Sequence, residues 1–99
     1  MAVFAAFAAV LSITVWPNGT AGPSTHRVVR CPGPAYCSKL TRAAFAPVPP
    51  GVMCSMVYGG PEQALVTGTL DGRKIYARFK RTDGCQTARW NRVAFLFHA

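Results

Sequence analysis

The chain contains few of the side chains that hydrolytic enzymes use. Its 99 residues include three acidic side chains, two histidines and eleven Lys and Arg, which give a net charge of +8. A pair of catalytic carboxylates, or a base with its orienting acid, would use nearly all of the acids and histidines. His26 and His98 are isolated in the sequence, and we interpret them as surface or partly packed residues. We therefore expect neither an enzyme nor a bound cofactor.

The four cysteines allow two other kinds of chemistry, metal binding and disulfide formation. Their spacings are Cys31-x5-Cys37 and Cys54-x30-Cys85, which lack the closely spaced pairs that are typical of zinc sites. Disulfides are the better interpretation, because a domain of this size has a small core and commonly needs cystines. Of the three pairings that four cysteines allow, Cys31 with Cys37 and Cys54 with Cys85 is the most economical. We predict no metal site.

An apolar segment around the third cysteine is a candidate recognition loop. Met53, Met56 and Val57 lie between the prolines of 47–50 and the run Gly59-Gly60-Pro61. Methionine is a common gap-filler in cores, and the simpler interpretation buries these residues. However, the prolines, a cystine and the Gly-Gly-Pro run all reduce the entropy that the segment would lose on binding. We therefore favour an exposed, preorganised loop.

Basic side chains provide the main alternative, a nucleic-acid-binding module. The basic residues of the C-terminal half are interleaved with two aromatic residues, Tyr76 and Trp90. These basic residues are Arg78, Lys80, Arg81, Arg89 and Arg92. Such surfaces can stack bases and bind phosphates. The sequence has no RNP, KH or zinc-finger pattern, and a solvated basic face explains the charge more simply. We expect Trp90 in the core, with Arg89 as its structural companion, and nucleic-acid binding as the weaker hypothesis.

Alternating patterns predict the strands that position these residues. A period of two indicates strands at 11–16, 26–30 and 93–97. The clearest element is a β-hairpin, in which Gln63 to Leu70 and Arg73 to Arg81 are joined by the turn Asp71-Gly72. The second arm should have an apolar core face and a basic solvated face, formed by Ile75, Ala77 and Phe79 and by Lys74, Tyr76, Arg78 and Lys80, respectively.

Two short helices complete the predicted elements. Residues 35–44 contain neither Gly nor Pro and place apolar residues four positions apart, while Cys85 to Asn91 predicts one or two helical turns. Three prolines in 45–51 exclude regular hydrogen-bonded structure just before the loop. With 51% apolar residues the chain should fold, and its length suits one domain.

Residues 1–9 resemble a shortened export signal. They are apolar and include Ala6-Phe7-Ala8, which fits the A-x-A cleavage pattern, but they lack a basic segment. The run is too short to span a bilayer, which takes about 20 apolar residues. We interpret 1–9 as a truncated signal-like segment, with an extension of the first strand as the alternative, and 10–99 as a secreted domain without stable membrane insertion.

The run Val52-Met53-Cys54-Ser55-Met56-Val57-Tyr58 resembles the reactive site of the Streptomyces subtilisin inhibitor family, the secreted serine-protease inhibitors of actinobacteria. The spacing from Cys54 to Cys85 and the segments 45–50, 58–61, 66–73, 81–85 and 88–90 are similar to that family as well. The resemblance covers about residue 11 to the C-terminus and is most specific in the second half. It implies an α+β fold, a five-stranded antiparallel sheet with one longer and one short helix, and a homodimer.

The resemblance also implies roles for the loop residues. Met56 would enter the primary specificity pocket of a subtilisin-like or chymotrypsin-like serine protease, and Met56-Val57 would be the reactive bond. Met53, Cys54 and Ser55 would precede this bond in the protease cleft, with Cys54 braced by Cys85, and Tyr58 would follow it.

Three departures from the family pattern bear on how well such a loop would inhibit. Ser55 stands where the family usually has proline, and Gly59-Gly60 adds a residue. Both changes favour a looser loop and weaker inhibition. The segment between Cys31 and Cys37 is also much shorter than in typical members.

Overall fold

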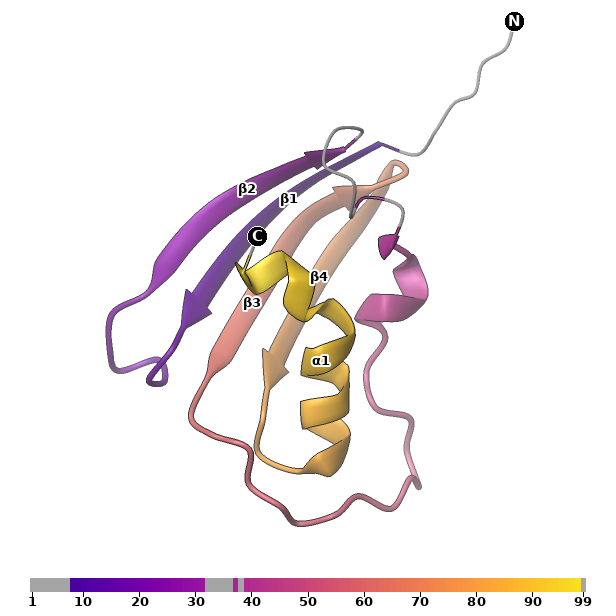
Figure 1. Ribbon diagram of the computed structural model, residues 1–99. Coiled ribbons are helices and arrows are strands. Elements are labelled where there is room, and N and C mark those ends of the chain that lie inside the picture. The colour runs from indigo at the N-terminus through magenta and orange to yellow at the C-terminus, as the bar shows by residue number, and fades with distance from the viewer. Residues whose placement is uncertain (1–7, 32–36, 38, 99) are drawn as a thin grey trace, which may run out of the picture.

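The chain folds into one antiparallel sheet with helices on one face. The computed structural model describes residues 8–31, 37 and 39–98. The strands are β1 (Ala9–Trp16), β2 (Thr25–Cys31), β3 (Gln63–Leu70) and β4 (Arg73–Lys80), in the order β2-β1-β3-β4 across the sheet. The helix α1 (Gly84–His98) lies across the sheet, and the short 3-10 helix η2 (Arg42–Phe45) lies beside it (Figure 1). The architecture is therefore α+β, as predicted, but with four strands in the described part of the chain.

The core forms where alternate strand residues meet α1. In β4 the predicted core residues Ile75, Ala77 and Phe79 are buried, and the residues that alternate with them, Lys74, Tyr76, Arg78 and Lys80, are exposed. The largest fully buried side chains come from all four strands and α1: Leu11, Ile13, Val29, Val66, Leu70, Phe79, Val93 and Leu96. The ring of Phe79 packs edge-on against Phe45 of η2 and Phe97 of α1. One small core therefore holds together the sheet, η2 and α1.

The hairpin prediction is confirmed. Strands β3 and β4 pair from Gln63 with Lys80 to Leu70 with Arg73. Asp71 and Gly72 have φ angles of 52° and 78°, as in the type I′ turn, whose twist matches that of the flanking strands. The strands predicted at 11–16 and 26–30 are also present, as β1 and β2, and pair with each other from Ala9 with Cys31 to Val15 with Thr25.

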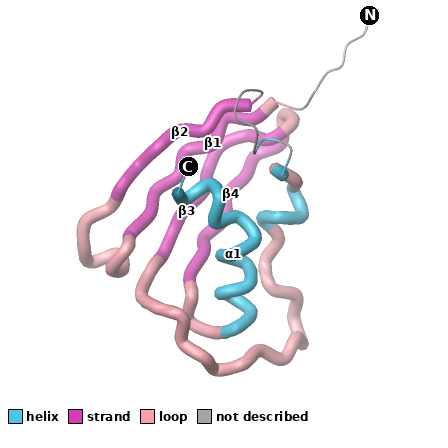
Figure 2. The backbone as a smooth tube through the Cα atoms, in the orientation of Figure 1, coloured by secondary structure: helices cyan, strands magenta, loops and turns pink. Residues whose placement is uncertain are grey.

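The fifth strand predicted at 93–97 is wrong, because these residues form the last turns of α1. The buried side chains of the helix are Arg89, Trp90, Val93, Leu96 and Phe97. Their spacing is that of one helical face. Over only five residues, part of such a face can look like the alternating pattern of a strand. The helix predicted for Cys85 to Asn91 is therefore the first half of a longer α-helix (Figure 2).

The described residues of 35–44 do not form the single continuous helix that was predicted for this segment. Residues 32–36 and 38 lie outside the described residues. Cys37 and Lys39 have 3-10 geometry, and the separate 3-10 helix η2 begins at Arg42. Thr41 has an extended backbone, with φ of −133° and ψ of 154°, and its hydroxyl oxygen accepts a hydrogen bond from the Ala44 N–H. This cap starts a new turn and is incompatible with a helix that continues through Thr41. The structure therefore has one α-helix in its described part, not two.

Two disulfides join the predicted pairs, Cys31 with Cys37 and Cys54 with Cys85. The first connects the end of β2 to the segment before η2, and the second connects the long loop before β3 to α1. Of the signal-like segment predicted at 1–9, residues 1–7 lie outside the described residues, and β1 begins at Ala9. No helix in the described ranges combines the length and apolar character that a membrane span requires.

Candidate functional site

The candidate loop lies within the long connection from η2 to β3, which passes below the first turn of α1 (Figure 1). Residues 52–60 form neither helix nor strand. The side chains of Met53 and Met56 are 96% and 88% exposed, and those of Val57 and Tyr58 are 68% and 63% exposed. These apolar residues therefore do not belong to the core, and the loop presents them to solvent.

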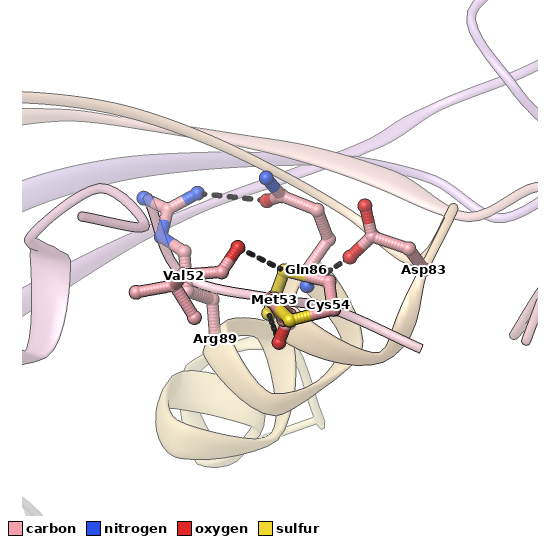
Figure 3. Close-up of a disulfide and its surroundings, with 7 residues drawn as sticks. Val52, Met53, Cys54, Asp83, Gln86 and Arg89 are labelled. Atoms are coloured by element: carbon pink, nitrogen blue, oxygen red, sulfur yellow. Dashed lines mark hydrogen bonds between the residues drawn. A yellow bond between two sulfur atoms is a disulfide. The ribbon is translucent and has the colours of Figure 1, made fainter. Parts of the chain in front are cut away.

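A cystine fixes the upstream half of this loop to α1. Cys54 is bonded to Cys85, with their Cα atoms 5.3 Å apart (Figure 3). Cys54 Sγ lies 3.7 Å from the Val52 carbonyl oxygen, and Cys85 Sγ lies 3.8 Å from the Met53 carbonyl oxygen. Cystine sulfurs carry no hydrogen, so these are packing contacts. The loop backbone is thus folded closely around the disulfide just before the exposed residues.

Two backbone hydrogen bonds hold the loop on either side of its most exposed part. The Gly84 N–H donates to the Ser55 carbonyl oxygen at 2.9 Å, and the Gly59 N–H donates to the Arg81 carbonyl oxygen at 2.7 Å. Between these attachment points lie only three residues, 56–58. The peptide bond between Met56 and Val57 is therefore presented on a short arch whose two ends are fixed to the segment 81–85.

Glycines allow this close attachment. A Cβ atom at Gly59 would lie 2.7 Å from Thr87 Oγ1 and 3.1 Å from the Arg81 carbonyl oxygen. A Cβ atom at Gly84 would overlap Ser55 Oγ. Gly59 was expected to loosen the loop, but its N–H is held and its α-carbon packs against the chain that follows β4.

An ion pair closes the downstream end of the loop. Arg81 Nη1 lies 2.9 Å from Glu62 Oε2, and both side chains are about 30% exposed (27% and 31%). A pair with this exposure contributes on the order of 1 kcal/mol or less. Its geometric effect is more specific, because the same arginine binds Gly59 through its carbonyl oxygen and Glu62 through its guanidinium.

Arg89 fixes the approach to the loop from inside the fold. Its guanidinium donates to the carbonyl oxygens of Phe45, Ala46 and Arg78 at 3.4, 2.8 and 2.9 Å. It also lies 4.4 Å from the ring centre of Phe79. Burial, with a smaller contribution from the charge of Arg92, lowers the pKa of Arg89, although arginine keeps its proton in proteins. Arg89 packs on Phe79, and Trp90, which was expected in the core, is buried and packs on Phe97.

Asp83 lies close to the cystine and caps α1. Its carboxylate accepts a hydrogen bond from the Gln86 N–H at 2.8 Å, a typical N-cap interaction (Figure 3). With Cys54 and Cys85 it forms the one group of potential metal ligands found in the described part of the chain. Both sulfur atoms are used in the disulfide, so this group offers a single free ligand, the carboxylate.

The residues suggested for nucleic-acid binding do not form one surface. Arg89 and Trp90 are buried, and Arg81 is paired with Glu62. Tyr76, Arg78 and Lys80 are exposed on β4, and Arg92 is exposed on α1. The structure therefore divides the cluster seen in the sequence between the core, the loop support and an exposed strand.

Three supporting residues were missed from the sequence: Arg81, Glu62 and Gly84. The sequence offered one signal, because Glu62 is one of three acids in a chain with eleven basic residues and so has many potential partners. Glu62 does form an ion pair, three residues beyond Gly59. Comparison with protein-family models, with curated proteins and with solved structures found no match. The likeness to the subtilisin inhibitors accordingly rests on the sequence motifs alone.

Proposed function

We propose that the protein inhibits subtilisin-like serine endopeptidases by presenting Met56-Val57 as its reactive bond. One observation carries this proposal: three exposed residues, 56–58, form an arch that is fixed at both ends to the segment 81–85. The resemblance of 52–58 to a reactive site supports the same assignment. The basic residues suggested in the C-terminal half are divided between the core, the support of the loop and β4, so they do not form one site of that composition.

The arch has the properties that tight binding by a loop requires. An extended segment can pair its backbone with the edge of a protease cleft, while side chains such as Met56 fill pockets. Burying a methionine side chain contributes about 1.5 to 3 kcal/mol, which is too little to explain tight inhibition. The remainder must come from preorganisation, because a loop that is already fixed loses less entropy on binding.

The same attachments would slow the release of cleaved product. Ser55 and Gly59 are held on opposite sides of the reactive bond by hydrogen bonds that cleavage does not break. The new carboxylate of Met56 and the new amine of Val57 would therefore stay close together and could rejoin. An unbranched apolar residue suits subtilisin-like and chymotrypsin-like pockets, whereas a trypsin-like pocket has an acidic floor.

The test is inhibition of a panel of subtilisin-like, chymotrypsin-like and trypsin-like proteases by the oxidised protein. Met56→Asp should reduce inhibition of subtilisin-like enzymes at least a hundredfold, because it places a charge in an apolar pocket. Met53→Asp, at an equally exposed position, is the matched control and should have a much smaller effect. Both variants should unfold at the wild-type temperature. Equal inhibition by the Met56→Asp variant and the wild-type protein would refute the proposal.

We also propose that the protein is secreted and forms a homodimer. Two disulfides in one short chain are typical of proteins that fold in an oxidising compartment. The homodimer is inferred from the family resemblance. Detection of the oxidised chain in culture medium and sedimentation of the purified protein would test the two statements separately.

A further inference from the structure

No element in the described part of the chain covers the outer face of the sheet, and this face carries a row of basic side chains. The outer face consists of the strand residues that point away from α1, and the strand register places them in rows across the sheet. Lys74, Tyr76, Arg78 and Lys80 alternate along β4. Strand β4 is one of the two edge strands of the sheet (Figure 1). We call these four residues the β4 stripe.

The charged side chains of the outer face are all positive and lie on its two edge strands. The outer-face positions of β1 and β3 hold no cation, and Val10 and Val28 are exposed there. Arg30 of β2 adds a fourth cation to the three of the β4 stripe, and all four side chains are exposed. None of the outer-face positions in the four strands holds an acidic residue. The three acids of the chain lie elsewhere: Glu62 pairs with Arg81, Asp71 is in the hairpin turn and Asp83 caps α1. The cations of the β4 stripe therefore remain available to an anionic partner.

An exposed aromatic ring lies between these cations. Tyr76 is 70% exposed, and Lys74 and Arg78 stand two residues away on either side of it. Residues two apart on a strand are about 7 Å apart, similar to the separation of neighbouring phosphates in an extended nucleic-acid strand. The rows beside the stripe offer hydroxyl groups, since Thr69 lies opposite Lys74 and Thr67 opposite Tyr76. A ring flanked by cations at this spacing can stack one base while the cations bind the adjacent phosphates.

Charge and shape favour one occupant over others. A second copy that laid its own β4 stripe on this one would bring together six cations, three from each copy, with no acidic partner between them. The proposed homodimer would therefore have to use another part of the surface. Duplex DNA keeps its base faces stacked and could not use Tyr76. We propose that the β4 stripe binds single-stranded nucleic acid, with Tyr76 stacking on a base and Lys74, Arg78 and Lys80 contacting phosphates. This site is separate from the loop 52–60, and the proposal does not depend on protease inhibition.

The first experiment measures binding of a fluorescein-labelled single-stranded oligothymidylate by fluorescence anisotropy at low salt. Tyr76→Ala should weaken binding about tenfold, the loss expected for one stacked base. Tyr58→Ala is the matched control, because this tyrosine has similar exposure but lies on the loop. It should leave binding unchanged. No binding at low salt, or equal losses in the two variants, would overturn the proposal.

The second experiment measures the salt dependence of the same binding. Each phosphate contact to a single strand contributes about −0.7 to the slope of log K against log salt concentration. Lys74→Gln combined with Arg78→Gln should therefore make the slope shallower by about 1.4. Arg42→Gln combined with Arg92→Gln, exposed residues of η2 and α1, removes the same charge and should change the slope much less. Equal changes in both double variants would contradict the proposal, as would tighter binding to anionic lipid vesicles, heparin or duplex DNA.

Discussion

At the scale of single residues, Gly59 shows how the arch is held. Its N–H is bound to the Arg81 carbonyl oxygen, and its α-carbon faces Thr87 so closely that a side chain would not fit. Its φ angle lies outside the left-handed region, so alanine is compatible with the backbone here and only the contact opposes it. Gly84, on the facing segment, differs because the atom that a Cβ would meet is the hydroxyl of Ser55, which can rotate away.

We predict that Gly59→Ala lowers stability and weakens protease inhibition, whereas Gly84→Ala changes both much less. In Gly59→Ala the new methyl group would press on the Arg81 carbonyl oxygen, which belongs to the backbone and cannot move independently. Overpacking of this kind costs about 1 to 3 kcal/mol. Thermal unfolding and inhibition assays on the two variants would check the prediction. Equal effects of the two substitutions would show that the space around Gly59 is not what fixes the loop.

At the scale of elements, the hairpin was predictable and the C-terminal helix was only partly so. β3 and β4 have long alternating patterns and a turn whose residues accept positive φ, so local and global preferences agree. In 93–97 the apolar residues fit the period of a strand and the period of a helix equally well, and five residues are too few to distinguish the two. The spacing of Trp90, Val93 and Phe97 over a longer window indicates the helix. Thr41 interrupts the predicted first helix through its cap, which sequence periodicity does not reveal.

The loop was the most predictable part of the candidate site, and the hydrogen bonds that hold the loop were the least predictable part. Proline, glycine and cysteine positions predicted an exposed segment around Met56, and the economical cysteine pairing is confirmed. The hydrogen bonds from Gly84 and Gly59 join residues 22 or more positions apart, between backbone groups. Every residue has such groups, so no side-chain pattern marks those that pair.

Leu96→Ala distinguishes the helix from the predicted strand. In α1 the Leu96 side chain is fully buried, so its truncation should lower the free energy of unfolding by about 3 kcal/mol. In a strand with Val93, Phe95 and Phe97 facing the core, Leu96 would face solvent and its loss would cost little. Denaturant unfolding monitored by circular dichroism measures the difference. Asn91→Ala, an exposed position of the same helix, is the control and should be nearly neutral. A cost for Leu96→Ala as small as that of Asn91→Ala would contradict the helical assignment.

At the scale of the whole molecule, the fold holds together the two pieces that cleavage of the arch would create. Residues 1–56 contain β1 and β2, and residues 57–99 contain β3, β4 and α1. β1 pairs with β3 along eight residue pairs, from Ala9 with Leu70 to Trp16 with Gln63. The Cys54–Cys85 disulfide joins the pieces covalently, on the two sides of the reactive bond. In the chain-entropy model a cross-link of this length stabilises the fold by about 3.5 kcal/mol.

We predict that prolonged incubation with a subtilisin-like protease gives a cleaved form that stays folded and still inhibits. Its mass without reductant should exceed that of the intact chain by one water molecule, and reductant should separate it into fragments 1–56 and 57–99. The variant with both Cys54→Ser and Cys85→Ser loses the covalent join and one attachment of the arch. It should unfold at a lower temperature and be degraded as a substrate. If the oxidised protein is instead degraded as fast as this variant, the attachments do not retain the cleaved ends and the inhibitory mechanism fails. A second outcome would count against the mechanism as well. If the protease cleaves the Met56→Asp variant at the same bond as the wild-type protein, the arch is a general site of proteolysis rather than a specific one.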